Sequence, residues 1–405
     1  MENNIPNFTF CITSKNNLRY LKHAVSYIKD NCFNKNHEIL VFIDSDNDGT
    51  EKWCKLNEIK YIKNPNQELY GIGRAYNLLV ENATTKFVVI YHADMIAGKN
   101  MDLNLYKNWK PNTVVSATRI EPPLHPSDPA KIVENFGLWP EKDIQDGFEE
   151  EKFNSFIEES LIKFEDKTTN GIFAPWLIHK DDFNDVEGHD PIMKSHSEDR
   201  DLFNRFLLNG YNIVQSWDAL VYHLTCRGGQ FEHANSTKDL QTKSENWNKL
   251  AQNQTREFIR KWSTPPLYDE YQYPIVSPKY NIAYVVKKCN FELLDILEPW
   301  CDRIYIDDEM GVLLAYYYEK EQSNTSYDLN KRILPINFND PIGENDIVVE
   351  FDATRLTNEN FQLLQQLPKI IKESGEVGKF ELDIFTIEII SLIEQQQELI
   401  KLKAC

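Results

Sequence analysis

The chain has 405 residues, of which 41% are hydrophobic, so it can bury more than one core and a wholly disordered protein is excluded. Its 63 acidic against 44 basic side chains give a net charge of −19, which disfavours nucleic acid as a partner and suits a divalent cation. No apolar run approaches 18 residues and no leader-like pattern opens the sequence, so neither a transmembrane segment nor secretion is expected. Seven scattered cysteines without a C-x-x-C pair predict reduced thiols and a cytoplasmic location.

Strand patterns alternate with helix patterns over the first hundred residues. This alternation predicts an α/β fold with a mostly parallel sheet covered on both faces. In such sheets ligands collect at the carboxyl ends of the strands, and three polar segments, 13–14, 44–46 and 92–94, follow strand patterns here. The predicted strands are 8–12, 38–43, 59–62 and 87–91, and the predicted helices are 18–28 and 71–83.

The remainder divides into an insertion, a linker and a second domain. Residues 120–165 begin Pro-rich and end in an acidic amphipathic pattern at 148–165, which predicts a loop and helix inserted over one sheet edge of a domain spanning 1–265. The Pro- and Tyr-rich segment 266–280 is predicted to be a linker. A smaller α/β domain of unknown role is expected at 281–405, with no internal repeat in the chain. Its strand patterns are 282–286, 303–306 and 347–351, its helix patterns are 291–299 and 358–372, and apolar spacing over 389–402 predicts a further helix for self-packing or oligomerisation.

Several acids and one histidine follow predicted strands or open a predicted helix. Asp94, near Asp44 of the neighbouring strand end, suits a divalent ion, although an Asp there also caps turns. Acids at 198, 199 and 201 precede a helix pattern; one acid suffices to cap a helix, so three in four residues exceed that need. His223 follows a strand, where a structural histidine is the ordinary alternative to a metal ligand. In the C-terminal domain, Asp307, Asp308 and Asp352 are interpreted as solvated loop acids.

Together these segments resemble the family 2 glycosyltransferases with a GT-A fold, over about residues 7–235. Each piece is weak alone, but their common order makes coincidence unlikely. Two positions depart from the family pattern: His92 replaces the first acid of Asp-x-Asp, and Ile43-Asp44 replaces an Asp-Asp pair. The matching segments are Thr13-Ser14-x-Asn16, Asp44 to Thr50, Gly73-Arg74-Ala75-Tyr76-Asn77, His92-Ala93-Asp94, Phe183-x-x-Val186-x-Gly188-x-Asp190 in place of Phe-x-x-Val-Gly-Gly-Phe-Asp, and Glu198-Asp199-x-Asp201-Leu202-x-x-Arg205 followed by Gly210-Tyr211.

The resemblance implies a GT-A nucleotide-diphospho-sugar transferase that inverts the anomeric carbon. It implies a UDP- or GDP-sugar donor, Mn²⁺ or Mg²⁺, and a glycan, lipid-linked or protein acceptor. Asp199 is implied as the base that deprotonates the acceptor, with Glu198 positioning the acceptor or exchanging roles with it. The remaining implied roles are the metal for Asp94 and His223, the nucleotide for Thr13, Ser14, Asp44, Arg74, His92 and Ala93, and the donor or acceptor sugar for Trp176 and Asp201.

Two alternatives stay open. A nucleotidyltransferase or sugar-nucleotide synthase would share the α/β sheet, but residues 13–17 lack the Gly-rich phosphate loop that such enzymes carry. A non-catalytic carbohydrate-binding or scaffold protein on a decayed transferase fold is favoured by His92 and disfavoured by the intact Glu198-Asp199 pair. A strand Trp such as Trp176 also belongs more often to a core than to a sugar site.

Overall fold

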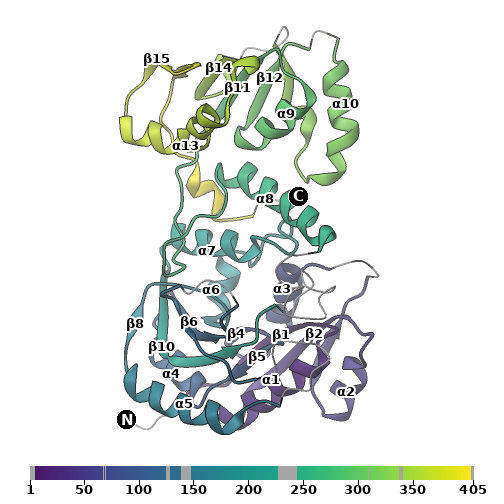
Figure 1. Ribbon diagram of the computed structural model, residues 1–405, viewed down its shortest axis with the longest axis vertical. Coiled ribbons are helices and arrows are strands. Elements are labelled where there is room, and N and C mark those ends of the chain that lie inside the picture. The colour runs from purple at the N-terminus through teal and green to yellow at the C-terminus, as the bar shows by residue number, and fades with distance from the viewer. Residues whose placement is uncertain are drawn as a thin grey trace. The chain divides into compact units, whose positions relative to one another are not determined.

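The computed structural model describes residues 5–66, 68, 70–124, 128–137, 147–226, 244–308, 310–336 and 341–402 (Figure 1). The chain forms two compact units, each with its own sheet. The first unit comprises Met1–Leu250 and Tyr268–Pro274, and the second comprises Ala251–Leu267 and Ile275–Cys405. The segment 266–280, predicted as a linker, is therefore divided between the two units.

The first unit is built on a ten-stranded sheet in the order β3-β2-β1-β4-β9-β6-β10-β5, with β7 beside β6 and β8 beside β10. Strands β1 to β4 are parallel, β9 is antiparallel to both β4 and β6, and β10 is parallel to β6. The carboxyl ends of β1, β2, β4, β6 and β10 therefore meet at one edge of the sheet. The strands are β1 (Phe8–Lys15), β2 (Glu38–Ser45), β3 (Lys60–Lys63), β4 (Phe87–His92), β5 (Met95–Ala97), β6 (Thr113–Glu121), β7 (Lys131–Val133), β8 (Thr168–Thr169), β9 (Trp176–His179) and β10 (Asn212–His223).

Helices cover both faces of this sheet (Figure 1). Helices α1, α4 and α5 lie on one face, and α3, α6 and α7 lie on the other. The central strands are buried on both sides, which is why β1 and β4 consist of nearly continuous apolar residues. The helices are α1 (Leu18–Asn31), α2 (Thr50–Leu56), α3 (Ile72–Asn82), α4 (Met101–Lys107), α5 (Glu150–Lys163), α6 (Lys180–Asp185), α7 (Glu198–Leu208) and α8 (Glu245–Trp262), the last of which spans the division between the units.

The helix predicted at 148–165 is confirmed as α5. Its buried residues Phe153 and Ile157 form the apolar face, and Phe153 packs edge-on against Tyr27 of α1 and against Phe136. Parts of the predicted insertion, residues 125–127 and 138–146, lie outside the described residues. No helix in the described part of the chain combines the length and apolar character needed to cross a membrane.

The second unit has a six-stranded sheet in the order β13-β12-β11-β14-β16-β15. Its first four strands are parallel and β16 is antiparallel to β14, so it repeats the order of β3-β2-β1-β4 followed by antiparallel β9 in the first unit. The sequence analysis did not expect this internal repetition. The elements are β11 (Ile282–Lys287), α9 (Phe291–Leu297), β12 (Arg303–Ile306), α10 (Val312–Glu321), α11 (Leu329–Arg332), β13 (Ile333–Pro335), α12 (Pro341–Glu344), β14 (Ile347–Asp352), α13 (Asn358–Ser374), β15 (Gly378–Leu382) and β16 (Phe385–Ile389).

Charged side chains are buried in the second unit as a closed network. Glu298 is fully buried and receives hydrogen bonds from Arg260 at 2.6 Å and from Arg332 at 2.6 Å. Burial opposes ionisation of this carboxyl, but the two guanidinium groups outweigh it and lower its pKa to about 2. The network thus pairs every charge that it buries, which a low-dielectric core requires.

The predicted helix at 389–402 is wrong. Ile389 ends strand β16, which pairs with β14 and β15, and only Gln396–Leu399 forms a short 3₁₀ turn. Along β16 the buried apolar residues 385, 387 and 389 alternate with a period of two, as in a strand. The apolar residues that follow residue 389 also fit helical spacing, so the sequence pattern did not distinguish the two structures.

Candidate active site

Three potential metal ligands meet at the carboxyl edge of the first sheet. His92 ends β4, Asp94 follows it, and His223 ends β10. The antiparallel register places His223 opposite Met95, so the residue after Asp94 sits beside His223. One ligand atom from each of the three side chains lies within 4.8 Å of the others, and His223 Nε2 is 3.8 Å from Asp94 Oδ2. The strand order thus assembles residues that are more than 120 positions apart in the sequence.

The donor set fits a divalent transition metal. Two imidazoles and one carboxylate suit Mn²⁺ or Zn²⁺ better than an all-oxygen site would, and they leave coordination positions for other oxygens. Burial lowers the pKa of His92 and outweighs the opposing charges of Asp94 and Asp199, which favours the neutral imidazole that a metal ligand requires.

A buried carboxylate fixes the tautomer of His223. Glu121, at the end of β6, lies 2.7 Å from His223 Nδ1, and it also accepts from Arg119 at 2.8 Å and Lys131 at 3.0 Å. Burial alone would raise the pKa of Glu121, but the His223 hydrogen bond and the charges of Arg119 and Lys131 hold it well below its usual range. Nδ1 therefore donates to Glu121, and Nε2, on the side of Asp94, is the nitrogen that would bind a metal.

Glu121→Gln is expected to weaken Mn²⁺ binding about 10- to 100-fold, the usual effect of removing a carboxylate behind a ligating histidine. Isothermal titration with Mn²⁺ measures this change directly. Glu158→Gln is the matched control, because Glu158 on α5 is exposed and only pairs with Lys99. Equal affinities for the two variants would show that Glu121 does not support the metal site.

A cavity of about 250 Å³ opens beside His223. Its walls include the charged side chains Arg119, Glu121 and Lys131 and the ring of Phe173. The Arg119 guanidinium stacks over that ring at 3.8 Å from its centroid. A cavity with fixed hydrogen-bonding groups and one aromatic wall suits a polyhydroxylated ligand.

The acids predicted for catalysis lie at the N-terminus of α7. Asp199 keeps a side-chain exposure of 31% and its Oδ1 is 3.2 Å from Nε2 of the fully buried His189. Asp199 also interacts electrostatically with His92, so the acid and the metal-ligand cluster share one region of the site. Burial opposes ionisation of Asp199, but the hydrogen bond and charge of His189 outweigh it and lower its pKa. Asp199 is therefore an anion that solvent or a substrate can reach.

Glu198, unlike Asp199, is buried and neutral. It is 9% exposed, and within the described part of the chain its Oε2 has no hydrogen-bond partner. Burial and then the negative charge of Asp199 raise its pKa, so Glu198 is the neutral member of the pair. The two adjacent acids thus differ in protonation, which favours Asp199 over Glu198 as a base.

Glu198→Gln is expected to become more stable relative to the wild type as the pH rises above about 4.5, the ordinary value of a Glu pKa. Above that pH the unfolded Glu198 ionises while the folded one stays protonated, so the wild type loses about 1.4 kcal/mol per pH unit until the raised native pKa is passed. Gln does not titrate and escapes this loss. Chemical denaturation at pH 5 and pH 8 measures the difference, and a gap that is equal at both pH values would contradict a neutral buried Glu198.

The residues predicted to bind nucleotide lie along the neighbouring strand ends. Thr13 pairs in register with His92 and donates a hydrogen bond to the Tyr76 hydroxyl at 3.3 Å. The buried Ser14 hydroxyl has no hydrogen-bond partner in the described segments. The Asp44 carboxylate accepts from the Asn64 side chain at 2.8 Å and the Tyr70 amide at 3.3 Å.

The last two of this group differ in burial. Ala93 is buried between the two metal-ligand candidates of its segment, and Arg74 is exposed on α3. The nucleotide roles of all six residues stay predictions, although strand topology brings five of them to one edge.

Two predicted sugar-contacting residues are not brought to this surface. Trp176 is fully buried on β9, against Phe183 and Phe203, and presents no ring face to a ligand. Asp201 is fully buried and pairs with Arg205 at 2.9 Å. Arg205 in turn donates to the carbonyls of Val186 and Gly188. By holding Arg205, Asp201 therefore stabilises the buried side of the loop that follows α6.

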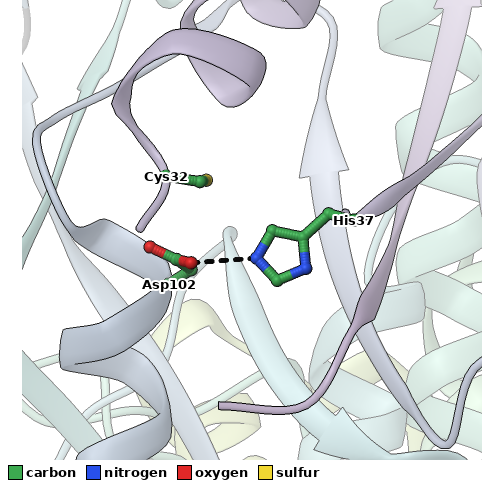
Figure 2. Close-up of side chains that lie close together, drawn as sticks. All are labelled: Cys32, His37 and Asp102. Atoms are coloured by element: carbon green, nitrogen blue, oxygen red, sulfur yellow. Dashed lines mark hydrogen bonds and ion pairs between the residues drawn. The ribbon is translucent and has the colours of Figure 1, made fainter. Parts of the chain in front are cut away.

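A second group of potential ligands, Cys32, His37 and Asp102, lies elsewhere in the first unit (Figure 2). His37 Nδ1 already accepts the amide of Phe8 at 2.9 Å, and its Nε2 is 2.9 Å from Asp102. Asp102 also accepts the amides of Phe33 and Asn34. Since both imidazole nitrogens are used and burial raises the pKa of Cys32 well above normal, this cluster joins α1, β1 and α4 and does not offer a metal site.

The acids at strand ends of the second unit have local partners. Asp308 caps α10 through the amides of Val312 and Leu314, and Asp307 accepts the amide of Lys288. Asp352 pairs with the Lys288 ammonium group at 2.6 Å. These contacts agree with their interpretation as structural loop acids.

Sequence reasoning did not single out His189, Glu121, Arg119 or Lys131. His189 occupies the unassigned position of the Phe-x-x-Val segment, where a polar residue in place of Phe was a signal. Glu121 lies in the sequence Arg119-Ile120-Glu121, an alternation of charged residues in an otherwise buried strand, which was equally visible.

A match to a known family covers the N-terminal part of the first unit and ends before α7 and β10. Residues 9–186 match the model of Glycosyl transferase family 2. This segment is therefore similar to family 2 glycosyltransferases, as predicted, and its mostly parallel sheet agrees with the predicted α/β fold.

Solved structures similar to this chain include three glycosyltransferases. GalNAc-T7 with UDP, GalNAc and Mn²⁺ has 12% identity and a TM-score of 0.42, over 65% of this chain and 52% of that one. TarS 1-349 of S. aureus with UDP has 15% identity and a TM-score of 0.39, over 54% and 60%. The mannosyltransferase PcManGT of Pyrobaculum calidifontis with GDP-Man and Mn²⁺ has 16% identity and a TM-score of 0.38, over 56% and 59%. The match thus spans 52% to 60% of these chains, and no curated protein sequence matches.

Proposed function

We propose that the protein is a metal-dependent, inverting glycosyltransferase that moves a sugar from a UDP- or GDP-sugar to an acceptor hydroxyl. The observation that carries this proposal is the meeting of His92, Asp94 and His223 at the sheet edge, with an ionised Asp199 in electrostatic contact with His92. The acceptor is a glycan, a lipid-linked molecule or a protein. A cytoplasmic location stays a prediction from the cysteine pattern.

In this proposal, residues at different strand ends bind different parts of the donor. His92, Asp94 and His223 would hold a divalent cation, Mn²⁺ in preference to Mg²⁺, which when bound would neutralise the charge that grows on the departing diphosphate. Thr13, Ser14 and Asp44 line the base and ribose pocket, and the exposed Arg74 pairs with the diphosphate. The cavity beside His223 receives the sugar, with Arg119 and Lys131 as hydroxyl partners.

Asp199 accepts the proton of the acceptor hydroxyl as that oxygen attacks the anomeric carbon. Its anionic state and exposure suit a base, whereas the protonated Glu198 suits a hydrogen-bond donor to the acceptor. In a single displacement the acceptor enters opposite the leaving diphosphate, so the anomeric configuration inverts.

His92 argues against a decayed, non-catalytic relative. His92 stands where the family pattern has an acid, which favoured that alternative, but its side chain lies close enough to Asp94 and His223 to be a third ligand. The site thus combines three candidate metal ligands with an ionised acid, which a binding protein does not need.

A thermal-shift panel of UDP, GDP, dTDP, CMP and ADP, each with Mn²⁺, Mg²⁺ or EDTA, tests the donor site. A ligand that binds only the folded state raises the melting temperature by mass action, by an amount equivalent to about 2.7 kcal/mol at a hundredfold excess over Kd. We expect a metal-dependent shift with UDP or GDP. If no nucleotide changed the melting temperature of the folded protein, the proposal would be overturned and the non-catalytic alternative would be favoured.

A further inference from the structure

We propose that His189 is a positioning residue that holds the Asp199 carboxylate in the orientation required of the catalytic base. The proposal rests on the proposed function, in which Asp199 deprotonates the acceptor. It adds a residue from the loop between α6 and α7, which does not contribute to the metal cluster.

The contact itself is a buried imidazole against a reachable carboxylate. His189 is 0% exposed, and its Nε2 lies 3.2 Å from Asp199 Oδ1. Because a carboxylate anion accepts only, Nε2 carries the hydrogen and donates it. One oxygen of Asp199 is thereby fixed by the protein interior, while the side chain keeps the 31% exposure that an acceptor needs to reach it.

Helix α3 holds the histidine from the other side. The Asn77 side chain accepts the His189 amide and donates to its carbonyl, both at 2.8 Å. The Tyr76 ring stacks on the imidazole at 5.8 Å between centroids and 28° between planes. A Cβ at Gly73 would lie 2.9 Å from the His189 Cβ, so glycine there permits the approach. The segment 73–77 is therefore built to fix the position of this imidazole.

The other nitrogen of the ring shows that the histidine is not there to complete the core. His189 Nδ1 is buried and has no hydrogen-bond partner among the residues that the structure describes, which costs stability. The surrounding rings of Tyr76, Trp176 and Phe183 would accept a phenylalanine, the residue of the family pattern at this position. The hydrogen bond of the His189 side chain to Asp199 explains why a polar ring stands at this buried position despite the loss of stability.

Other charges also act on Asp199, and they belong to different elements. His92 of β4 and Arg200 of α7 favour its anion, and Glu198 of the same helix interacts with it. The Tyr76 hydroxyl of α3 senses its charge as well. Of these groups, His189 makes the hydrogen bond, so it sets the orientation while the others contribute at longer range.

The test compares His189→Phe with His189→Gln. Phe keeps a ring and removes the donor, whereas the Gln side-chain amide reaches about as far as Nε2 and restores one. We expect His189→Phe to lower kcat about ten- to hundredfold at pH 6, with the deficit narrowing as the pH rises, because the base then needs a higher pH to ionise. The KM for the nucleotide-sugar and the metal affinity should not change, and His189→Gln should recover most of the rate.

Two readouts do not depend on activity. The melting temperature of His189→Phe should equal or exceed that of the wild type, since an unpartnered buried nitrogen is removed. In ¹⁵N-histidine spectra, Nε2 of His189 should carry a hydrogen, and Asp199→Asn should shift the His189 signals. A lowered melting temperature with an equal loss of kcat at every pH, or histidine signals unmoved by Asp199→Asn, would overturn the proposal. Wild-type protein that transfers no sugar would instead contradict the proposed function, and the spectra would still decide the pairing.

Discussion

Asp199→Asn is expected to abolish sugar transfer while leaving nucleotide and metal binding intact. The amide cannot accept the acceptor proton at neutral pH, and general-base catalysis contributes about 10²- to 10⁴-fold to such reactions. The substitution keeps the shape of a side chain that contacts His189 and is only partly buried, so the fold should survive. Release of nucleoside diphosphate in the presence of acceptor measures the loss, and a thermal shift with the nucleotide measures retained binding.

A matched control and a discriminating variant accompany this prediction. Asp181→Asn also changes an acid in the first turn of a helix, but its side chain is 87% exposed, so its turnover should equal that of the wild type. Glu198→Gln should retain far more activity than Asp199→Asn, because Glu198 is already neutral. If Asp199→Asn turned over normally and Glu198→Gln did not, the two roles would have to be exchanged.

Asp94→Asn is expected to remove metal-dependent donor binding. It replaces the only carboxylate among the three ligand candidates, so the loss of Mn²⁺ affinity should exceed the about 10- to 100-fold expected for Glu121→Gln behind His223. Titration calorimetry with Mn²⁺, followed by titration of the nucleotide with and without the metal, separates the two binding events.

The second ligand-like cluster supplies the control. Cys32→Ala alters the group of Cys32, His37 and Asp102, in which the imidazole is already fully hydrogen-bonded (Figure 2). It should bind Mn²⁺ as the wild type does. Metal binding that survives Asp94→Asn and disappears in Cys32→Ala would place the metal at the cluster of Cys32, His37 and Asp102. That result would contradict the assignment of the metal to His92, Asp94 and His223.

Much of the fold and part of the site could be predicted from the sequence, for a physical reason. Fully buried strands such as 8–12 and 87–91 are continuous apolar runs, and the polar residue that stops each run marks a carboxyl end. Parallel topology then brings such ends together, which is why Asp44, His92 and Asp94 could be grouped in advance. His223 joined them through the order of family motifs.

The rest depended on contacts that no local pattern encodes. Glu121 acts through His223, 102 positions away, and His189 is held by Asn77, 112 positions away. Trp176 and Asp201 matched expected site positions in the sequence, but the packing of β9 and α7 turned both inward. The helix prediction for 389–402 was wrong because its apolar residues fit both a strand period and a helix period.

The most direct test of the central claim is the release of nucleoside diphosphate from a panel of UDP- and GDP-sugars by the wild type, with Mn²⁺ or with EDTA. Sugar transfer requires that one donor lose its diphosphate, and the metal ligands at the sheet edge require that this loss stop in EDTA. We expect release from at least one donor with Mn²⁺, none in EDTA and none from Asp199→Asn. Release that continues in EDTA would contradict the metal role of His92, Asp94 and His223. No release from any donor, together with no nucleotide binding, would contradict the glycosyltransferase activity itself.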